Sequence, residues 1–257
     1  MLASVQKFVI CRAIMLFTSM LPVCLPAETA ASQKEIKVAV ATNFTAAMDV
    51  ISDRYEKQTG TAIKRSASAT GILYAQIINS APFDLFLAAD EKRPALLHQL
   101  ELCEEPFTYA TGEVVLWSTR SDLDETQDWH QTVLRNDVKR IAIPNPETAP
   151  YGEAAIQALK KSGLAEMVHN RLVYGQNVGQ AFQYARQESA DLAFVARTYA
   201  LSELGRQGKA WDLPEAPPVI QNGCILKHNG DRETVLDFVA YLKTNEARKI
   251  LATFGYE

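Results

Sequence analysis

The chain has 257 residues, of which 47% are hydrophobic and 22% charged, an ordinary composition for a globular protein of one large or two modest domains. Its formal net charge of −4 argues against nucleic acid or an anionic membrane surface as the partner. Local neutral dipoles could still bind a small anion.

The N-terminal segment has the features of a secretory signal peptide. Lys7 and Arg12 precede an apolar run over residues 13–25, and small residues follow it. The run is short and interrupted by prolines, so it does not suit a membrane span. We expect residues 1–27 to be removed and the mature chain to be exported to the periplasm. A lipid anchor on Cys24 is the alternative.

From residue 34 the chain alternates strand-like and helix-like segments, which predicts an α/β fold with largely parallel sheets. The predicted strands are 35–41, 61–66, 84–88, 107–112, 113–117, 140–143, 171–174, 192–195 and 219–226. The predicted helices are 45–57, 71–79, 92–100, 152–161, 179–188, 232–244 and 247–254.

Four predicted strand-to-helix junctions share small or hydroxyl side chains: 42–45, 66–71, 146–152 and 176–180. Helix N-termini leave N–H groups unpaired and can bind an anion without Lys or Arg. In doubly wound sheets such junctions meet in one ligand crevice. The pattern predicts a cage of neutral donors for a small dianion. The alternative at the first junction is that Thr42 or Asn43 merely caps the helix.

Two cysteines, Cys103 and Cys224, remain in the predicted mature chain. In an oxidising compartment they could form a disulfide, and the alternative is two unrelated buried thiols. Spacing in the sequence does not decide between these alternatives.

Several blocks recur in one known family in this order and spacing, among them Ala41-Thr42-Asn43-Phe44 and Asn177-Val178-Gly179-Gln180-Ala181. The others are 74–77, 81–86, 88–92, 115–118, 145–146, 149–152 and 190–196. Over about residues 34–256 the sequence resembles the periplasmic molybdate-binding proteins of molybdate ABC transporters.

This resemblance implies the type 2 periplasmic binding protein fold. It has two α/β lobes, each a mixed, mostly parallel sheet flanked by helices, and two crossing segments form the hinge. The resemblance places lobe I at residues 33–109 and 219–257 and lobe II at 110–218. The predicted strand 107–112 and the proline-rich stretch 213–218 fall where the crossings belong.

The resemblance also implies the ligand contacts. They are Thr42 and Asn43 after the first strand, Thr70 where the family usually has serine, Tyr151, and the backbone N–H of Val178. Threonine keeps the hydroxyl donor but adds a methyl group to the cleft.

One position departs from the pattern of some family members. They add a tyrosine hydroxyl after the strand that here ends at Val195, and this chain has Ala196 instead. We expect either that Tyr151 supplies the missing contact or that selectivity among oxyanions differs.

The implied function is capture of molybdate, and of tungstate, by a monomer that delivers the ion to a membrane permease, with no cofactor and no nucleic-acid partner. A binding protein for another oxyanion such as sulfate is the first alternative. An enzyme on the same scaffold is the second, but the sequence contains no common catalytic motif and its four histidines are scattered.

Overall fold

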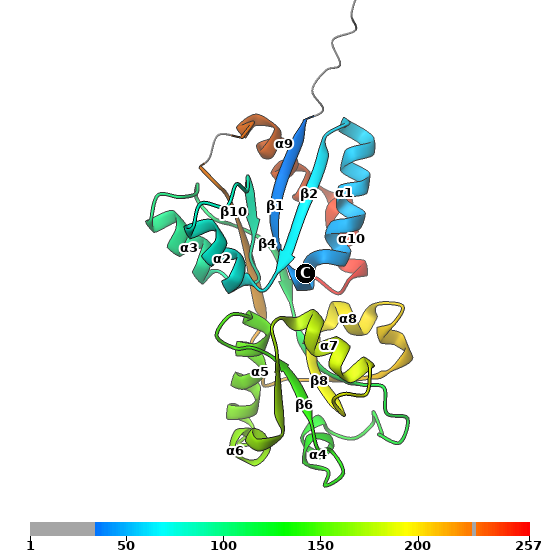
Figure 1. Cartoon of the computed structure of the whole chain (residues 1–257). Helices are drawn as coiled ribbons and strands as arrows, with labels where there is room; N and C mark the ends of the chain where they lie inside the picture. The colour runs from blue at the N-terminus through cyan, green and yellow to red at the C-terminus, as the bar shows by residue number, and fades with distance from the viewer. Residues whose placement is uncertain (1–33, 228–229) are drawn as a thin grey trace, which may run out of the picture. The chain divides into compact units, whose positions relative to one another are not determined.

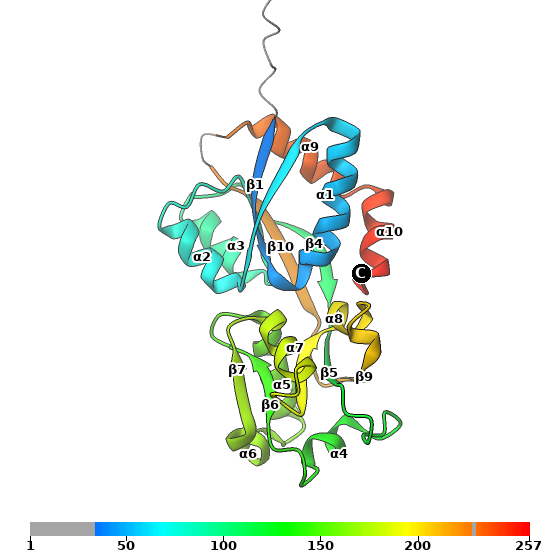
Figure 2. The same ribbon diagram turned by 45° about the vertical axis from the view of Figure 1, so that its right-hand side comes forward.

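The computed structural model describes residues 34–227 and 230–257, so the predicted signal peptide and Cys24 lie outside the described residues. Two five-stranded sheets, each flanked by helices, account for this part of the chain (Figures 1 and 2). None of the helices described is long and apolar enough to cross a membrane. The predicted α/β class is confirmed.

The first sheet has the strand order β2-β1-β3-β10-β4. Its first three members are parallel, and β10 runs antiparallel to both of its neighbours. The strands are β1 (Glu35–Ala41), β2 (Ala62–Ser68), β3 (Leu85–Leu87), β4 (Phe107–Gly112) and β10 (Val219–Ile225). We refer to this sheet and its helices as lobe I.

Helices cover both faces of the first sheet (Figure 1). One group packs on the hydrophobic cluster that contains Phe44, Met48 and Phe238, and the other on the cluster that contains Leu73 and Leu97. The first group is α1 (Thr45–Thr59), α9 (Arg232–Leu242) and α10 (Asn245–Thr253), and the second is α2 (Thr70–Ile78) and α3 (Lys92–Gln99).

The second sheet has the order β7-β6-β8-β5-β9, and with its helices it forms lobe II. The strands are β5 (Val114–Ser118), β6 (Ile141–Pro144), β7 (Leu172–Gly175), β8 (Leu192–Ala196) and β9 (Lys209–Asp212). The helices are α4 (Trp129–Leu134), α5 (Pro150–Lys161), α6 (Ala165–Val168), α7 (Val178–Arg186) and α8 (Arg197–Leu201).

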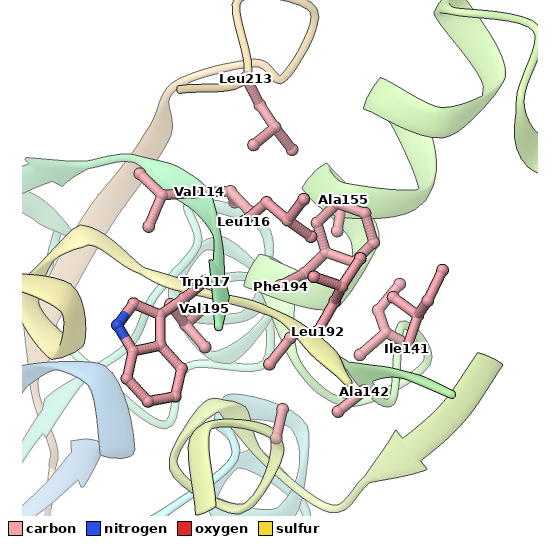
Figure 3. Close-up of a cluster of buried hydrophobic side chains, with 14 of the residues drawn as sticks. Val114, Leu116, Trp117, Ile141, Ala142, Ala155, Leu192, Phe194, Val195 and Leu213 are labelled. Carbon is pink, nitrogen blue, oxygen red and sulfur yellow. The ribbon is translucent and has the colours of Figure 1, made fainter. Parts of the chain in front are cut away.

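A continuous apolar core holds lobe II together. The central strands β5 and β8 are buried along their whole length, which explains their unbroken runs of apolar residues. Figure 3 shows Leu116, Phe194 and Leu192 directed toward Ala155 of α5, with Trp117 toward the other end of the cluster. This core makes the sheet a rigid support for the loops at the ends of its strands.

The chain passes between the two sheets twice. Only Glu113 separates β4 in the first sheet from β5 in the second, and residues 213–218 connect β9 back to β10. Arg197 pairs with Asp212 at 2.8 Å and also with Glu113, so one side chain joins the first crossing to the end of the strand that leads into the second.

Most predicted elements occur where the sequence places them. The first strand is found at Glu35–Ala41, and Gly60 ends α1 in the left-handed region with φ 74°, as its predicted role requires. The elements that the prediction missed are short: α4, α6, α8 and β9, together with single 3-10 turns.

Candidate functional site

All five predicted ligand residues line one small cavity between the lobes. Its volume is only about 10 Å³. Sites for organic ligands are far larger, so the size favours a small inorganic ion. The lining residues are Ala41, Thr42, Asn43, Ser68, Ala69, Thr70, Ala89, Ala149, Pro150, Tyr151, Asn177 and Val178.

The four predicted junctions meet at this cavity because parallel strands end at a common edge of each sheet. In lobe I, Ala41 at the end of β1 is paired with Ser68 at the end of β2. In lobe II, Pro144 at the end of β6 is paired with Gly175 at the end of β7. The segments that follow these strands open a 3-10 turn (Thr42–Phe44) and helices α2, α5 and α7.

A glycine lets α5 start this close to the sheet. A Cβ at Gly152 would lie 2.0 Å from the carbonyl oxygen of Pro144, so any side chain there would displace the start of the helix. The N–H groups of Tyr151 and Val178 lie in the first turns of α5 and α7, where no intrahelical acceptor exists. Both residues line the cavity, so these two N–H groups are candidate donors to a bound ligand.

The Thr42 hydroxyl is buried and has no hydrogen-bond partner among the described residues. The carbonyl oxygen of Thr42, in contrast, accepts from the hydroxyls of Thr45 at 2.9 Å and Tyr199 at 3.2 Å. Neither Thr42 nor Asn43 makes a side-chain cap on the 3-10 turn or on α1. The alternative that these two residues serve only as helix caps is therefore wrong.

Thr70 combines a structural contact with a free donor. Its hydroxyl oxygen accepts the N–H of Ala89 at 3.0 Å, and both residues line the cavity. Because that bond uses a lone pair, the hydroxyl proton remains able to donate to a ligand.

Asn43 and Tyr151 turn their side chains away from the cavity into a buried polar cluster. The Asn43 amide nitrogen donates to Gln221 Oε1 at 2.8 Å and to the hydroxyl of Tyr256 at 3.1 Å. The Tyr151 hydroxyl accepts from Gln221 Nε2 at 3.2 Å. Both residues line the cavity while the polar atoms of their side chains bond elsewhere, so the Tyr151 hydroxyl is engaged by Gln221 and not by the cavity.

Sequence reasoning missed Tyr199, Gln221 and Tyr256. Tyr199 follows Ala196 by three residues, so a tyrosine hydroxyl does come after β8, where it supports Thr42 through its carbonyl. Gln221 and Tyr256 lie in a strand and at the C-terminus, where no motif distinguishes them. Their role depends on contacts distant in sequence.

The cavity contains no cation and no carboxylate among its lining residues. Its one ionisable member is Tyr151, and burial raises the pKa of that phenol well above its usual value. The nearby arginines pair elsewhere: Arg65 with Asp49 at 2.8 Å, and Arg93 with the carbonyl oxygen of Glu147 at 2.8 Å. A bound anion would therefore be held by neutral donors alone.

The two cysteines are buried neighbours in the small cluster of lobe I that also contains Leu97. Both are free thiols in this structure, and Cys103 Sγ also donates to the carbonyl oxygen of Pro94 at 3.6 Å. Hydrogen bonding to Cys103 and burial raise the pKa of the Cys224 thiol. They are thus not unrelated thiols, although no disulfide joins them here.

A family profile described as "Bacterial extracellular solute-binding protein" matches residues 36–257. The molybdate-binding protein ModA of Azotobacter vinelandii is 39% identical over 236 residues, which are 88% of this chain and 91% of the relative. The chain belongs to the ModA family of bacterial extracellular solute-binding proteins. ModA of Rhodobacter capsulatus is 34% identical, covering 88% of this chain and 89% of that one.

Solved structures agree with this membership of the ModA family. The periplasmic molybdate-binding protein of A. vinelandii superimposes with a TM-score of 0.82 at 33% identity, covering 86% of this chain and 98% of that one. The sulfate-binding protein SubI of Mycobacterium tuberculosis has a TM-score of 0.70 at 15% identity, over 87% of this chain and 86% of that one, and shows the fold alone. The predicted family and two-lobed fold are confirmed, and the family is one of binding proteins rather than enzymes.

Proposed function

We propose that this ModA-family chain binds molybdate, and also tungstate, in the cavity between its lobes. It acts in the periplasm as a monomer without a cofactor and delivers the ion to the permease of an ABC transporter. The named relatives support the ligand and the transport role, since two ModA proteins are more than 30% identical to it.

The observation that carries the proposal is the unpartnered hydroxyl of Thr42. A buried donor without an acceptor costs about 1–3 kcal/mol. A fold that retains such a group at the wall of a cavity is best explained by an acceptor that arrives with the ligand. An oxyanion supplies that acceptor.

The other donors match a tetrahedral dianion. Thr42, Asn43, Thr70, Tyr151 and Val178 line the cavity and come from both lobes. The donors they would supply are the two threonine hydroxyls and the backbone N–H groups of the other three residues. Helix N-termini stabilise negative charge at such positions. An ion that accepts from both lobes also favours the arrangement in which they are close together.

The donor set also discriminates between anions. Phosphate is partly protonated at neutral pH and needs an acceptor for its proton, which the lining residues do not offer as a carboxylate. Sulfate is fully ionised and differs from molybdate mainly in size. Sulfate is therefore the competitor that a test must include.

Calorimetric titration of the mature protein with molybdate, tungstate, sulfate and phosphate tests the proposal. We expect tight binding of the first two, with a matching rise in melting temperature, because a ligand that binds only the folded state stabilises it. Binding of sulfate but not of molybdate would overturn the assignment of the substrate. No binding of any of the four anions would overturn the proposed function.

A further inference from the structure

A cluster of buried polar side chains lies behind the cavity, and we call it the hinge network. Its members are Asn43, Tyr109, Tyr151, Gln221 and Tyr256. Gln221 is fully buried, and its side chain bonds to Asn43 at 2.8 Å, Tyr109 at 3.1 Å and Tyr151 at 3.2 Å. A buried network of this kind specifies one geometry, because a displaced member is left unpaired in a dry interior.

Tyr256 is the second-last residue of the chain, yet it is held in place as firmly as a core residue. Its side chain is 4% exposed, and its ring packs against Phe44 with centroids 5.4 Å apart. Its neighbour Glu257 makes two backbone hydrogen bonds to Thr111 of β4, at 2.8 and 3.0 Å. The C-terminus is therefore fixed to the strand that crosses to lobe II.

The hydroxyl of Tyr256 acts directly on a cavity residue. It donates to the backbone carbonyl of Asn43 at 2.7 Å and accepts from the Asn43 amide nitrogen at 3.1 Å. These two bonds fix both the backbone and the side chain of Asn43, which lines the cavity. Tyr256 itself does not line the cavity.

The hinge network joins the two lobes. Tyr151 lies in the first turn of α5 in lobe II, whereas Asn43, Gln221 and Tyr256 come from lobe I. The bond from Gln221 to Tyr151 therefore exists only while the lobes are together. Gly112, at the crossing, leaves the necessary space, because a Cβ there would lie 2.1 Å from the Tyr151 hydroxyl and 2.9 Å from Gln221 Nε2.

We propose that Tyr256 is a positioning residue for oxyanion binding, which holds the hinge network in the geometry that keeps the two lobes closed on the ligand. The inference rests on the proposed function, because the ligand is what the closed lobes retain. Tyr256 contributes no ligand contact of its own. Its effect is on how long the bound state lasts.

The test compares Tyr256→Phe with Tyr241→Phe, using molybdate as the probe. Tyr241 is also a buried tyrosine of lobe I, but its hydroxyl has no hydrogen-bond partner in the described part of the chain, so its loss is a matched control. We expect Tyr256→Phe to weaken binding about ten-fold through faster dissociation, with the association rate unchanged. Tyr241→Phe should bind as the wild type does.

Tyr151→Phe removes the partner hydroxyl from lobe II while keeping the backbone N–H, and it provides the same test if Tyr256→Phe folds poorly. When Tyr151→Phe and Tyr256→Phe are combined, the two losses of affinity should be less than additive, because both substitutions act through one network. If the wild type binds molybdate and all three single variants release it at the wild-type rate, the positioning role is overturned and the proposed function stands. If the wild type binds none of the four oxyanions, both proposals fail.

Discussion

Replacing Thr42 by valine should weaken ligand binding while making the ligand-free protein more stable. The substitution keeps the branched shape and replaces the hydroxyl, which is buried and has no partner among the described residues, with a methyl group. The carbonyl of Thr42 keeps its bonds from Thr45 and Tyr199, so the backbone at the start of the site is retained.

The two effects have separate magnitudes. A hydrogen bond to a charged acceptor contributes about 1.5–3 kcal/mol, so we expect the Kd for molybdate to rise roughly 10- to 150-fold. Removing an unsatisfied buried hydroxyl should stabilise the free protein by about 1 kcal/mol. For a chain of this size that corresponds to a rise of about 2–4 °C in melting temperature.

Calorimetric titration and thermal melts of the free protein measure these effects, and Ser52→Ala is the control. Ser52 is another residue whose buried hydroxyl has no partner among the described residues, but it lies in α1 and does not line the cavity. Its removal should raise the melting temperature similarly and leave the Kd unchanged. A Thr42→Val variant with wild-type affinity, or one that melts lower without ligand, would refute the reasoning.

Val178→Pro removes one N–H at the first position of α7, where proline is tolerated because the preceding Asn177 is already extended. We expect a folded protein that binds molybdate at least ten-fold more weakly by calorimetry. The control Asn245→Pro, at the same position of α10, should bind molybdate as the wild type does. Thr70→Val should lower the free energy of unfolding, measured in urea, by about 1–3 kcal/mol, because the Ala89 N–H loses its acceptor. Thr70→Ser keeps the acceptor and should preserve stability, so equal stability of the two variants would contradict this prediction. Alkaline titration followed by phenolate absorbance should show steep unfolding between pH 10 and 12. Burial raises the pKa of Tyr256 from 10.0 to about 12, so the neutral phenol contributes fully to folding stability below pH 10, and this contribution is lost as the pH rises through 12. Ionisation of all phenols before the protein unfolds would contradict this prediction.

The regular elements could be predicted because their signals are local. The apolar run of β1, the glycine that ends α1 and the polar junction between them all lie within about 25 residues of sequence. Helices α6 and α8 were missed because four or five residues carry too little periodicity to be recognised. Strand β9 was missed for a similar reason, since it forms only by pairing with β5.

The cavity could be predicted in outline but the side-chain directions could not. Helix starts with small residues identify which backbone segments face a ligand. The structure brings all four predicted strand-to-helix junctions together at the cavity. Whether Asn43 points its amide at the ligand or behind it depends on Gln221 and Tyr256, which are 178 and 213 residues away in sequence. No local pattern contains that information.

Asn43 and Tyr151 connect the two parts of the mechanism. Each has its backbone at the cavity and its side chain in the hinge network, so ligand contact and lobe contact share the same residues. A substitution that moves the backbone of either residue therefore changes both contacts, whereas Tyr151→Phe removes only the bond within the network. Tyr256 does not line the cavity, and its hydroxyl bonds to the carbonyl of Asn43, so that hydroxyl can be removed without deleting any of the proposed ligand donors.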